Sequence, residues 1–219
     1  MDVTKHIRAP FLATRLAIGV LLAGAAFAGC GSDDDASSSG PQNAAGNGID
    51  RAFVSDMIPH HESAVDMAMV AERRGQSAFV KKLAEDIIRS QRAEITTLQG
   101  IAARLESAGV KAKSLGVPEH QMGMGASMSR LESAKPFDRA FIDMMIPHHQ
   151  GAIRMARVEI AEGSNAAAKD LATEIIDAQA REIRAMNKHR TEEFGGPSPT
   201  GGVPADEATH DGMSGMDHE

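Results

Sequence analysis

An internal repeat constrains this chain more than any other feature of its sequence. When the sequence is shifted by 88 residues, 23 of the 50 positions from 50 to 99 are identical without a gap. The segment DRAFVSDMIPHHESAVDM aligns with DRAFIDMMIPHHQGAIRM, and LAEDIIRSQRAEI aligns with LATEIIDAQAREI. We therefore expect the chain to build two similar units that bury their apolar faces against each other.

Each copy has two stretches of helical periodicity, separated at Gly75 in the first copy and at Gly163 in the second. We expect a left-handed glycine to end the first helix of each pair at these positions. Strand-like alternation is absent, so the sequence predicts an all-α bundle of two repeated helix pairs. The predicted helices cover residues 50–74, 77–106, 137–162 and 166–194.

Pro59 and Pro147 fall inside the first helix of each pair. Because proline removes an amide donor and clashes with the preceding turn, we expect a kink at the level of the following histidines. The alternative is that each helix starts at its proline. The early aspartate in DRAF favours a start further upstream, because an acidic residue stabilises a helix N-terminus.

The chain ends suggest export. Lys5, Arg8 and Arg15 precede an apolar run at 16–29, and Cys30 follows it directly. This order resembles a bacterial lipoprotein signal with Cys30 as the lipidation site, although Phe27 stands where an aliphatic residue is usual. Simple secretion or a retained N-terminal helix remain alternatives.

The predicted organisation is a signal peptide at 1–29, a flexible tether at 30–48, a bundle at 49–194 (repeats 49–106 and 136–194, crossover linker 107–135) and a disordered tail at 195–219.

Composition excludes several functions. The net charge of −7 and pI of about 5.7 leave no basic face for nucleic acid. The single cysteine excludes an intramolecular disulfide and a CxxC metal or redox site. No nucleotide-binding loop, GxSxG or HExxH motif occurs. With 13 Met, 9 His and no Trp or Tyr, the chain is instead rich in sulfur and imidazole.

The helix faces that should form the core carry these groups. Met57, His60 and Met67 share one face of the first helix, and His61 lies 100° further round. The second copy repeats the pattern with Met145, His148, His149 and Met155. On the partner helices, Gln91 with Glu94 and Gln179 with Glu182 interrupt the apolar stripe. Since a buried carboxylate needs a partner, Glu94 and Glu182 should meet a metal or one of the histidines.

Two segments outside the predicted helices combine His and Met with Gly. We predict that they are mobile and capture a metal ion before it reaches the bundle. Soft thioether and imidazole groups favour Cu(I) among the common metals, and make iron or manganese the weaker candidates. The residues are His120, Met122 and Met124 in the linker and His210, Met213, Met216 and His218 in the tail.

The MIPHH core followed by Gln-x-x-Glu-Ile resembles the family known as domain of unknown function 305, over roughly residues 49–194. The resemblance implies a ferritin-like four-helix bundle and, for extracytoplasmic members, an association with copper through His and Met. Leu98 stands where the second copy has Met186, so the first copy is poorer in sulfur. Carried over by position, the implied ligands are Met57, His60, His61 and Met67, and Met145, His148, His149 and Met155.

Three hypotheses follow. The first is a lipid-anchored extracytoplasmic protein that buffers or sequesters copper without turnover and exchanges it with an unidentified protein. The second is a ferritin-like oxidase that uses iron, manganese or copper; the spacing argues against it, because no helix has the Glu-x-x-His pair of di-iron bundles. The third is a metal-free envelope interaction module in which the polar core only fixes the helix register.

Overall fold

The chain folds into a helical bundle, as seen in a computed structural model that describes residues 45–125 and 127–205. Within these residues there are helices and no strands, which confirms the all-α prediction. Each end of the four long helices lies within two residues of its predicted position. The helices are α1 (Gly48–Arg74), α2 (Ala78–Ser107), α4 (Phe137–Glu162) and α5 (Ala166–Phe194), with the short helix α3 (Met128–Ser133) and the 3₁₀ turn η1 (Glu119–Gln121) between α2 and α4.

Side chains in the preceding loops cap three of the four long helices. Asn47 accepts hydrogen bonds from the amides of Ile49 and Asp50, while the Asp50 carboxylate accepts from the amide of Asn47, which forms a capping box. Ser77 and Asn165 cap α2 and α5 by accepting from amides three residues ahead. The loops at both hairpins therefore specify the helix starts locally.

The two hairpin glycines act differently from the prediction. Gly75 has φ −53° and Gly163 has φ −67°, so neither is left-handed. The constraint at both positions is steric instead. A Cβ at Gly75 would lie 2.6 Å from the carbonyl oxygen of Ala71, and a Cβ at Gly163 would lie 2.3 Å from Glu159 Oε1. Gly195, which ends α5, is in contrast left-handed, at φ +80°.

The helices α1 and α4 continue through Pro59 and Pro147. The alternative in which each helix begins at its proline is therefore wrong. The histidine pairs that follow the prolines lie near the middle of α1 and α4, where other helices can surround them.

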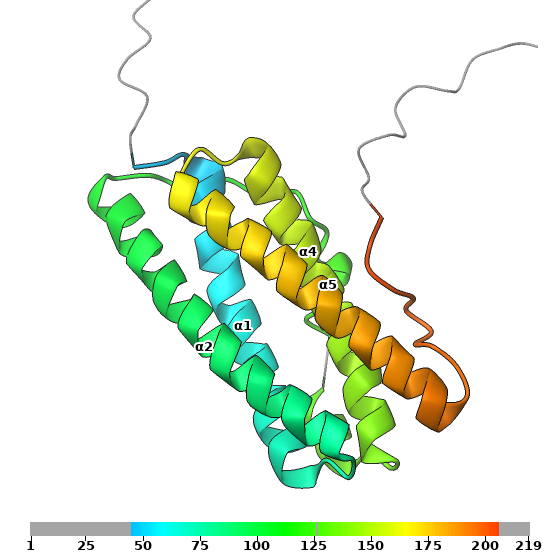
Figure 1. The fold of residues 1–219 in the computed structure, drawn as a ribbon. Coiled ribbons are helices and arrows are strands. Elements are labelled where there is room, and N and C mark those ends of the chain that lie inside the picture. The colour runs from blue at the N-terminus through cyan, green and yellow to red at the C-terminus, as the bar shows by residue number, and fades with distance from the viewer. Residues whose placement is uncertain (1–44, 126, 206–219) are drawn as a thin grey trace, which may run out of the picture. The chain divides into compact units, whose positions relative to one another are not determined.

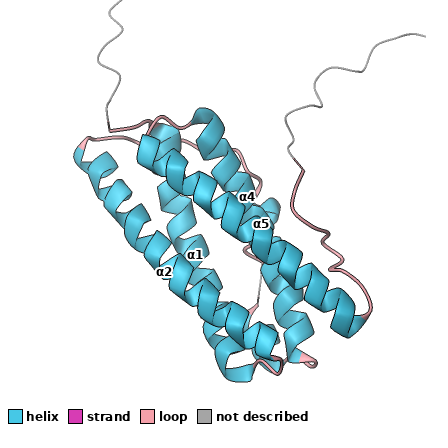
Figure 2. Ribbon diagram, viewed as in Figure 1, coloured by secondary structure: helices cyan, strands magenta, loops and turns pink. Residues whose placement is uncertain are grey.

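Helix α1 packs against α2 and α4 packs against α5, and the two pairs meet mainly through α1 and α4 (Figures 1 and 2). The aspartates of the two DRAF segments connect the pairs. Asp50 accepts hydrogen bonds from the amides of Ser164 and Asn165 at 2.9 and 2.7 Å, and Asp138 accepts from the amides of Gln76 and Ser77, both at 2.8 Å. The start of each repeat thus binds the hairpin loop of the other repeat.

The buried apolar side chains form two separate clusters. The first, called the Met67 cluster, contains Met67 of α1, Met145 of α4 and Met186 of α5. The second, called the Met57 cluster, contains Met57 of α1 and Met155 of α4. Each cluster therefore combines methionines from both repeats, as expected when α1 and α4 cross in opposite directions between them.

Two segments outside the four long helices, the end of the tether and the linker, are more ordered than the sequence suggests. Residues 45–47 of the tether pack against the bundle, where Asn165 Nδ2 donates to the carbonyl oxygen of Ala45. The linker 107–135 contains η1 and α3 and buries Leu115 and Leu131. Backbone carbonyls and apolar side chains of these segments find partners on the helices, which the Gly- and Ser-rich composition does not reveal.

Residues 195–205, predicted to belong to a disordered tail, also pack against the bundle. The guanidinium of Arg190 forms an ion pair with Asp143 at 2.6 Å and donates to the carbonyl oxygens of Gly196 and Pro197. Gln150 Nε2 donates to the carbonyl oxygens of Thr200 and Gly202. Polar side chains of α4 and α5 thus fix the tail backbone up to residue 205.

The predicted signal peptide at 1–29, the lipidation site Cys30 and the tether up to residue 44 lie outside the described residues, as do His210, Met213, Met216 and His218 of the tail. In the part of the chain that is described, no helix is both long enough and apolar enough to cross a membrane.

A buried carboxyl pair joins the start of α1 to the end of α4. Glu159 is fully buried beside Asp50, and neither of its oxygens meets a partner at regular hydrogen-bond geometry. Burial, followed by the proximity of Asp50, raises the pKa of Glu159 to about 8. Burial also opposes the ionisation of Asp50, but hydrogen bonds from backbone amides outweigh it and lower the pKa of Asp50. Glu159 is therefore the protonated member of the pair at neutral pH.

We expect Glu159→Gln to remove a pH dependence of the free energy of unfolding. Because the pKa of Glu159 is higher in the folded chain than its ordinary 4.5, the contribution of this group to the free energy of unfolding should be largest below pH 4.5 and be lost as the pH rises through about 8. The loss relative to the variant should reach a few kcal/mol, at about 1.4 kcal/mol per pKa unit. Urea unfolding between pH 5 and 9 measures it. The exposed Glu162→Gln on the same helix is the control, and parallel wild-type and E159Q profiles would contradict the assignment.

Candidate metal centre

A polar layer separates the two apolar clusters. On α1, His60 and His61 lie between Met57, which belongs to one cluster, and Ala64, which belongs to the other. The corresponding residues of α4 do the same, and so do the polar residues of α2 and α5. The layer consists of His60, His61, Gln91, Glu94, His148, His149, Gln179 and Glu182. The two copies of the sequence motif thus converge on one region at mid-bundle.

His60 and His148 meet at the crossing of α1 and α4. Their ring centroids are 3.8 Å apart at an interplanar angle of 41°, and their exposed fractions are 1% and 0%. Burial, followed by the charge of His61, lowers the pKa of His60 to about 3. Burial, followed by the charges of His60 and His149, lowers the pKa of His148 well below its ordinary value. Both rings are therefore neutral at physiological pH and offer a nitrogen lone pair.

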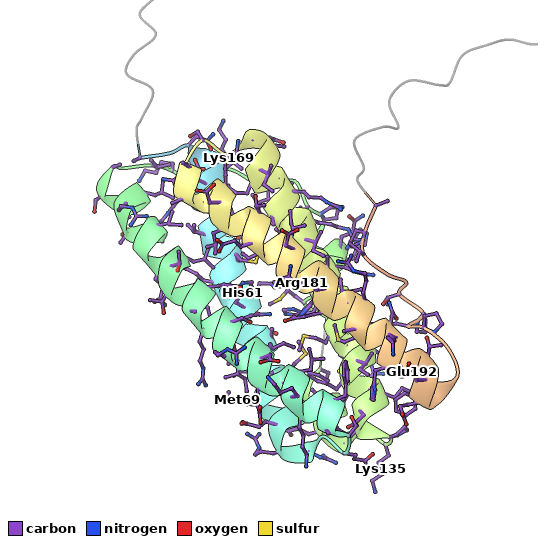
Figure 3. All side chains as sticks on the ribbon, in the orientation of Figure 1. His61, Met69, Lys135, Lys169, Arg181 and Glu192 are labelled. Atoms are coloured by element: carbon purple, nitrogen blue, oxygen red, sulfur yellow. The ribbon has the colours of Figure 1, made fainter. Side chains whose placement is uncertain are left out.

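His61 and His149 are each held by a glutamate of the partner helix. His61 Nε2 lies 2.6 Å from Glu94 Oε2, and His149 Nε2 lies 2.6 Å from Glu182 Oε2. The second contact has regular hydrogen-bond geometry, whereas the angle in the first is less favourable. Figure 3 shows His61 projecting from α1 between the helices, whereas Lys135 and Glu192 lie outside. A carboxylate behind an imidazole is the arrangement that orients metal-binding histidines in proteins.

Several buried nitrogens in the layer have no hydrogen-bond partner. Nδ1 of His60, His61 and His149 is unpaired. Neither ring nitrogen of His148 forms a regular hydrogen bond, although the backbone of His60 lies near the ring. Leaving a buried polar group unpaired costs roughly 1–3 kcal/mol. The four imidazoles therefore offer unpaired nitrogens as candidate donors to a metal ion.

Gln91 and Gln179 repeat this feature on α2 and α5. Each is 2% exposed, and neither the amide oxygen nor the amide nitrogen of either side chain has a partner. The sequence singled them out as interruptions of the apolar stripe, and the structure places them within the layer. They add polar groups whose burial the fold alone does not explain.

The predicted methionine ligands lie on both sides of the histidines, in groups that combine the two copies. Met57 and Met67 of the first copy belong to different clusters, and so do Met145 and Met155 of the second. One copy therefore does not supply a single converging set of ligands. Met57 groups with Met155, and Met67 groups with Met145 and Met186, because α1 and α4 cross in opposite directions. All five are buried, with exposed fractions of 0 or 1%.

The donor set fits a soft metal ion better than a hard one. Within residues 45–125 and 127–205, no three His, Cys, Asp or Glu side chains converge where they could hold a metal. A metal held by the buried histidines of the described chain would therefore need ligands of another kind as well, such as thioether sulfur. Imidazole nitrogen and thioether sulfur are available together, and these are the ligands that Cu(I) accepts.

The linker segment predicted to capture metal lies next to the layer. His60 Nε2 donates to the carbonyl oxygen of Met122 at 2.9 Å, which was not foreseen. The Met122 side chain is partly buried against the Met57 cluster. It is therefore packed, whereas the sequence predicted a mobile segment. His120 is exposed, and Met124 is exposed to 41%. The feature of the sequence that indicates this contact is the glycine-rich MGMG, because glycine lets the backbone of the linker approach α4 closely.

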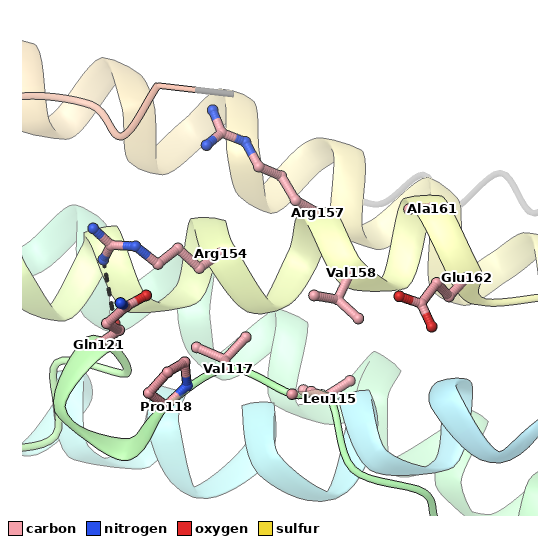
Figure 4. Close-up of a pocket in the computed structure, with 10 residues that line it drawn as sticks. Leu115, Val117, Pro118, Gln121, Arg154, Arg157, Val158, Ala161 and Glu162 are labelled. Atoms are coloured by element: carbon pink, nitrogen blue, oxygen red, sulfur yellow. Dashed lines mark hydrogen bonds between the residues drawn. The ribbon is translucent and has the colours of Figure 1, made fainter. Parts of the chain in front are cut away.

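Two hollows flank this region. A groove of about 380 Å³ between α2 and α5 has Glu182 in its wall, so the His149–Glu182 pair is close to solvent. A cavity of about 540 Å³ between α4 and the segment before η1 is lined by Leu115, Val117, Pro118, Arg154 and Val158, among others (Figure 4). None of the predicted metal ligands lines this cavity.

Comparisons with known proteins agree with this architecture. The family model described as Domain of unknown function (DUF305) matches residues 50–190. The chain belongs to this family. No curated protein matches the chain.

Solved structures of DUF305 relatives share the fold. CopM in the apo form is 31% identical with a TM-score of 0.57, and the match covers 67% of this chain and 98% of that chain. CopM in the Cu(I)-bound form is 32% identical with a TM-score of 0.56, covering 67% and 98%. A DUF305 protein from Streptomyces coelicolor, inferred to be secreted, is 26% identical with a TM-score of 0.59, covering 69% and 95%. CopM has also been solved in Cu(II)-bound and Ag-bound forms.

We expect the double variant Gln91→Met and Gln179→Met to be more stable than the wild-type protein in the absence of metal. Replacing an unpaired buried amide with an apolar side chain of similar size removes a desolvation cost, so the free energy of unfolding should rise by roughly 1–3 kcal/mol. Urea unfolding of the metal-free proteins measures the change. The exposed Gln99→Met should have little effect, and a destabilised double variant would show that the two amides do have partners.

Proposed function

We propose that this DUF305 protein binds copper in the bundle interior, favouring Cu(I), and buffers or sequesters it without catalytic turnover. The observation that carries the proposal is the set of buried imidazoles with unpaired nitrogens between two groups of buried methionines. Glu94 and Glu182, predicted as ligands, serve in this proposal to orient His61 and His149. Met57, Met67, Met145, Met155 and Met186 are the thioether ligands.

The comparisons support the choice of metal. CopM, which matches this chain at about the same identity in each form, has been solved with Cu(I), Cu(II) and Ag. Silver and Cu(I) are both soft monovalent ions, and both favour the sulfur and imidazole groups that this chain buries. Iron and manganese favour carboxylate-rich sites and fit these donors less well.

The proposed location is outside the cytoplasm, with Cys30 as the site of a lipid anchor in the cell membrane. This part of the proposal rests on the order of basic residues, apolar run and cysteine at the start of the sequence. A protein that holds copper there would exchange the ion with another protein, whose identity the sequence does not indicate. Mass spectrometry of the protein isolated from membranes tests the anchor. The wild-type chain should carry a lipid on Cys30, and a variant without Cys30 should carry none.

The oxidase and metal-free hypotheses have separate tests. An oxidase needs ligands that support redox turnover, so oxygen-dependent oxidation of Fe(II) or Cu(I) beyond one equivalent per site would favour it. A metal-free module would be isolated without copper and would bind none at chelator-buffered concentrations. Elemental analysis of the protein from its own host separates this hypothesis from both others.

We expect the double variant His60→Ala and His148→Ala to weaken Cu(I) binding by at least 100-fold. The ring centroids are 3.8 Å apart at the centre of the donor set, so the double substitution removes two of its four imidazoles at once. Anaerobic titration against a competing Cu(I) chelator measures the affinity. His189→Ala is the control, since His189 stacks on Phe79 away from the layer. Equal affinities of wild type and double variant would remove both histidines from the site.

We expect Leu98→Met to strengthen or add copper binding on the side of the Met57 cluster. Leu98 is buried in that cluster and occupies the position that Met186 has in the second copy, so the substitution adds a buried sulfur to those of Met57 and Met155 at nearly constant volume. Stoichiometry and affinity from the same titration should increase relative to wild type. Leu105→Met, in the same cluster but further along α2, should have no effect. Identical results for the two variants would show that sulfur at position 98 does not contribute to a site.

A further inference from the structure

The turn at residues 118–124 contacts the centre of the polar layer through its backbone. The carbonyl oxygen of Met122 is 2.9 Å from His60 Nε2. The turn is held internally, because the amides of Gln121 and Met122 donate to the carbonyl oxygens of Pro118 and Glu119. A carbonyl oxygen can only accept a hydrogen bond, so its partner Nε2 carries the proton of the neutral ring.

Two glycines allow this contact. A Cβ at Gly151 of α4 would lie 1.9 Å from the carbonyl oxygen of Met122, and a Cβ at Gly123 would lie 2.2 Å from the carbonyl oxygen of Pro147. Gly123 also has φ +74°, a conformation that other residues rarely adopt. No other residue at position 151 would leave room for the turn in this position.

The opposite side of the turn is fixed less tightly. Arg154 of α4 donates to the carbonyl oxygen of Gln121 at 3.2 Å, as the dashed line in Figure 4 shows. The same residues line the cavity of about 540 Å³. The turn is thus pressed against α4 at Gly151 and borders open space beyond Arg154, so a side chain at 151 can displace it.

The two halves of the layer differ at this point. Ser63 stands in the first repeat where the second has Gly151, and Asp66 stands where the second has Arg154. No backbone carbonyl within the described chain accepts a regular hydrogen bond from His148, whose two ring nitrogens are both unpaired. His60 is therefore the only one of this central pair whose ring is fixed by the turn.

We propose that the Met122 carbonyl is a positioning group of the metal centre, which fixes His60 as the tautomer protonated at Nε2 and presents only Nδ1 to a soft monovalent cation. The part that concerns the cation rests on the proposed function. The part that concerns the tautomer does not, because it applies to the metal-free protein. Nδ1 of His60 is buried and unpaired, as a nitrogen reserved for a ligand would be.

The experiment reads the tautomer directly. Metal-free protein with ¹⁵N-labelled histidine is examined by long-range ¹H–¹⁵N correlation NMR, with His60 assigned by comparison with His60→Gln. In the wild-type protein, Nε2 of His60 should be protonated and Nδ1 should not. Gly151→Ala should displace the carbonyl and give a mixture of tautomers. Gly125→Ala, in the same segment but with open space around its Cβ, should leave the spectrum unchanged. Arg154→Ala loosens the same turn from its other side and replaces Gly151→Ala if that variant fails to fold.

Anaerobic Cu(I) is then added to the same samples. The Nδ1 resonance of wild-type His60 should shift while Nε2 stays protonated, and Gly151→Ala should bind Cu(I) 10- to 100-fold more weakly, the usual effect of removing a group that orients a ligand. Protonation at Nδ1 in the wild-type protein, or Cu(I) on Nε2, would overturn the proposal. A fixed tautomer without any Cu(I) binding would retain the positioning role of the carbonyl and overturn the proposed function.

Discussion

The buried contact between His60 and His148 is the constraint on which the rest of the bundle depends. Two neutral imidazoles with unpaired nitrogens lie where α1 and α4 cross, in a position that an apolar pair could fill at lower cost. The apolar clusters on either side supply the stability that tolerates this layer. The sequence contains the histidine pair in both copies despite this cost.

The crossing also determines which residues of the two repeats work together. Since α1 and α4 run in opposite directions across the histidines, the methionine before one pair meets the methionine after the other. The hydrogen bonds of Asp50 and Asp138 to the opposite hairpin loops fix this register at both ends. Each copy of the motif therefore contributes half of the polar layer, and the methionine groups on either side of the layer combine residues of both copies.

Periodicity predicted the helices, the buried stripe of α1 and the interrupted stripes of α2 and α5, because these depend on local spacing alone. The pairing of Glu94 with His61 was among the predicted partners for the same reason. How the methionines of the two copies group was left open, since spacing along one helix does not reveal how two helices cross. The contact of the Met122 carbonyl with His60 could not be predicted either. A backbone contact depends on the sequence only through small residues such as Gly151, and the role of Gly151 is recognised only when the position of the neighbouring segment is known.

The differences between the copies follow a common physical pattern. Arg190, which is held by its ion pair with Asp143, and Gln150 donate hydrogen bonds to the segment after α5, whereas the first copy has Ala102, Ser55 and Glu62 at these positions. Gly151 leaves room for the linker turn, where the first copy has Ser63. The His, Gln and Glu positions of the polar layer are identical in the two copies, whereas the positions of α4 and α5 that meet the tail and the turn differ. The two repeats therefore share the residues that face the layer and differ in those that bind the irregular segments.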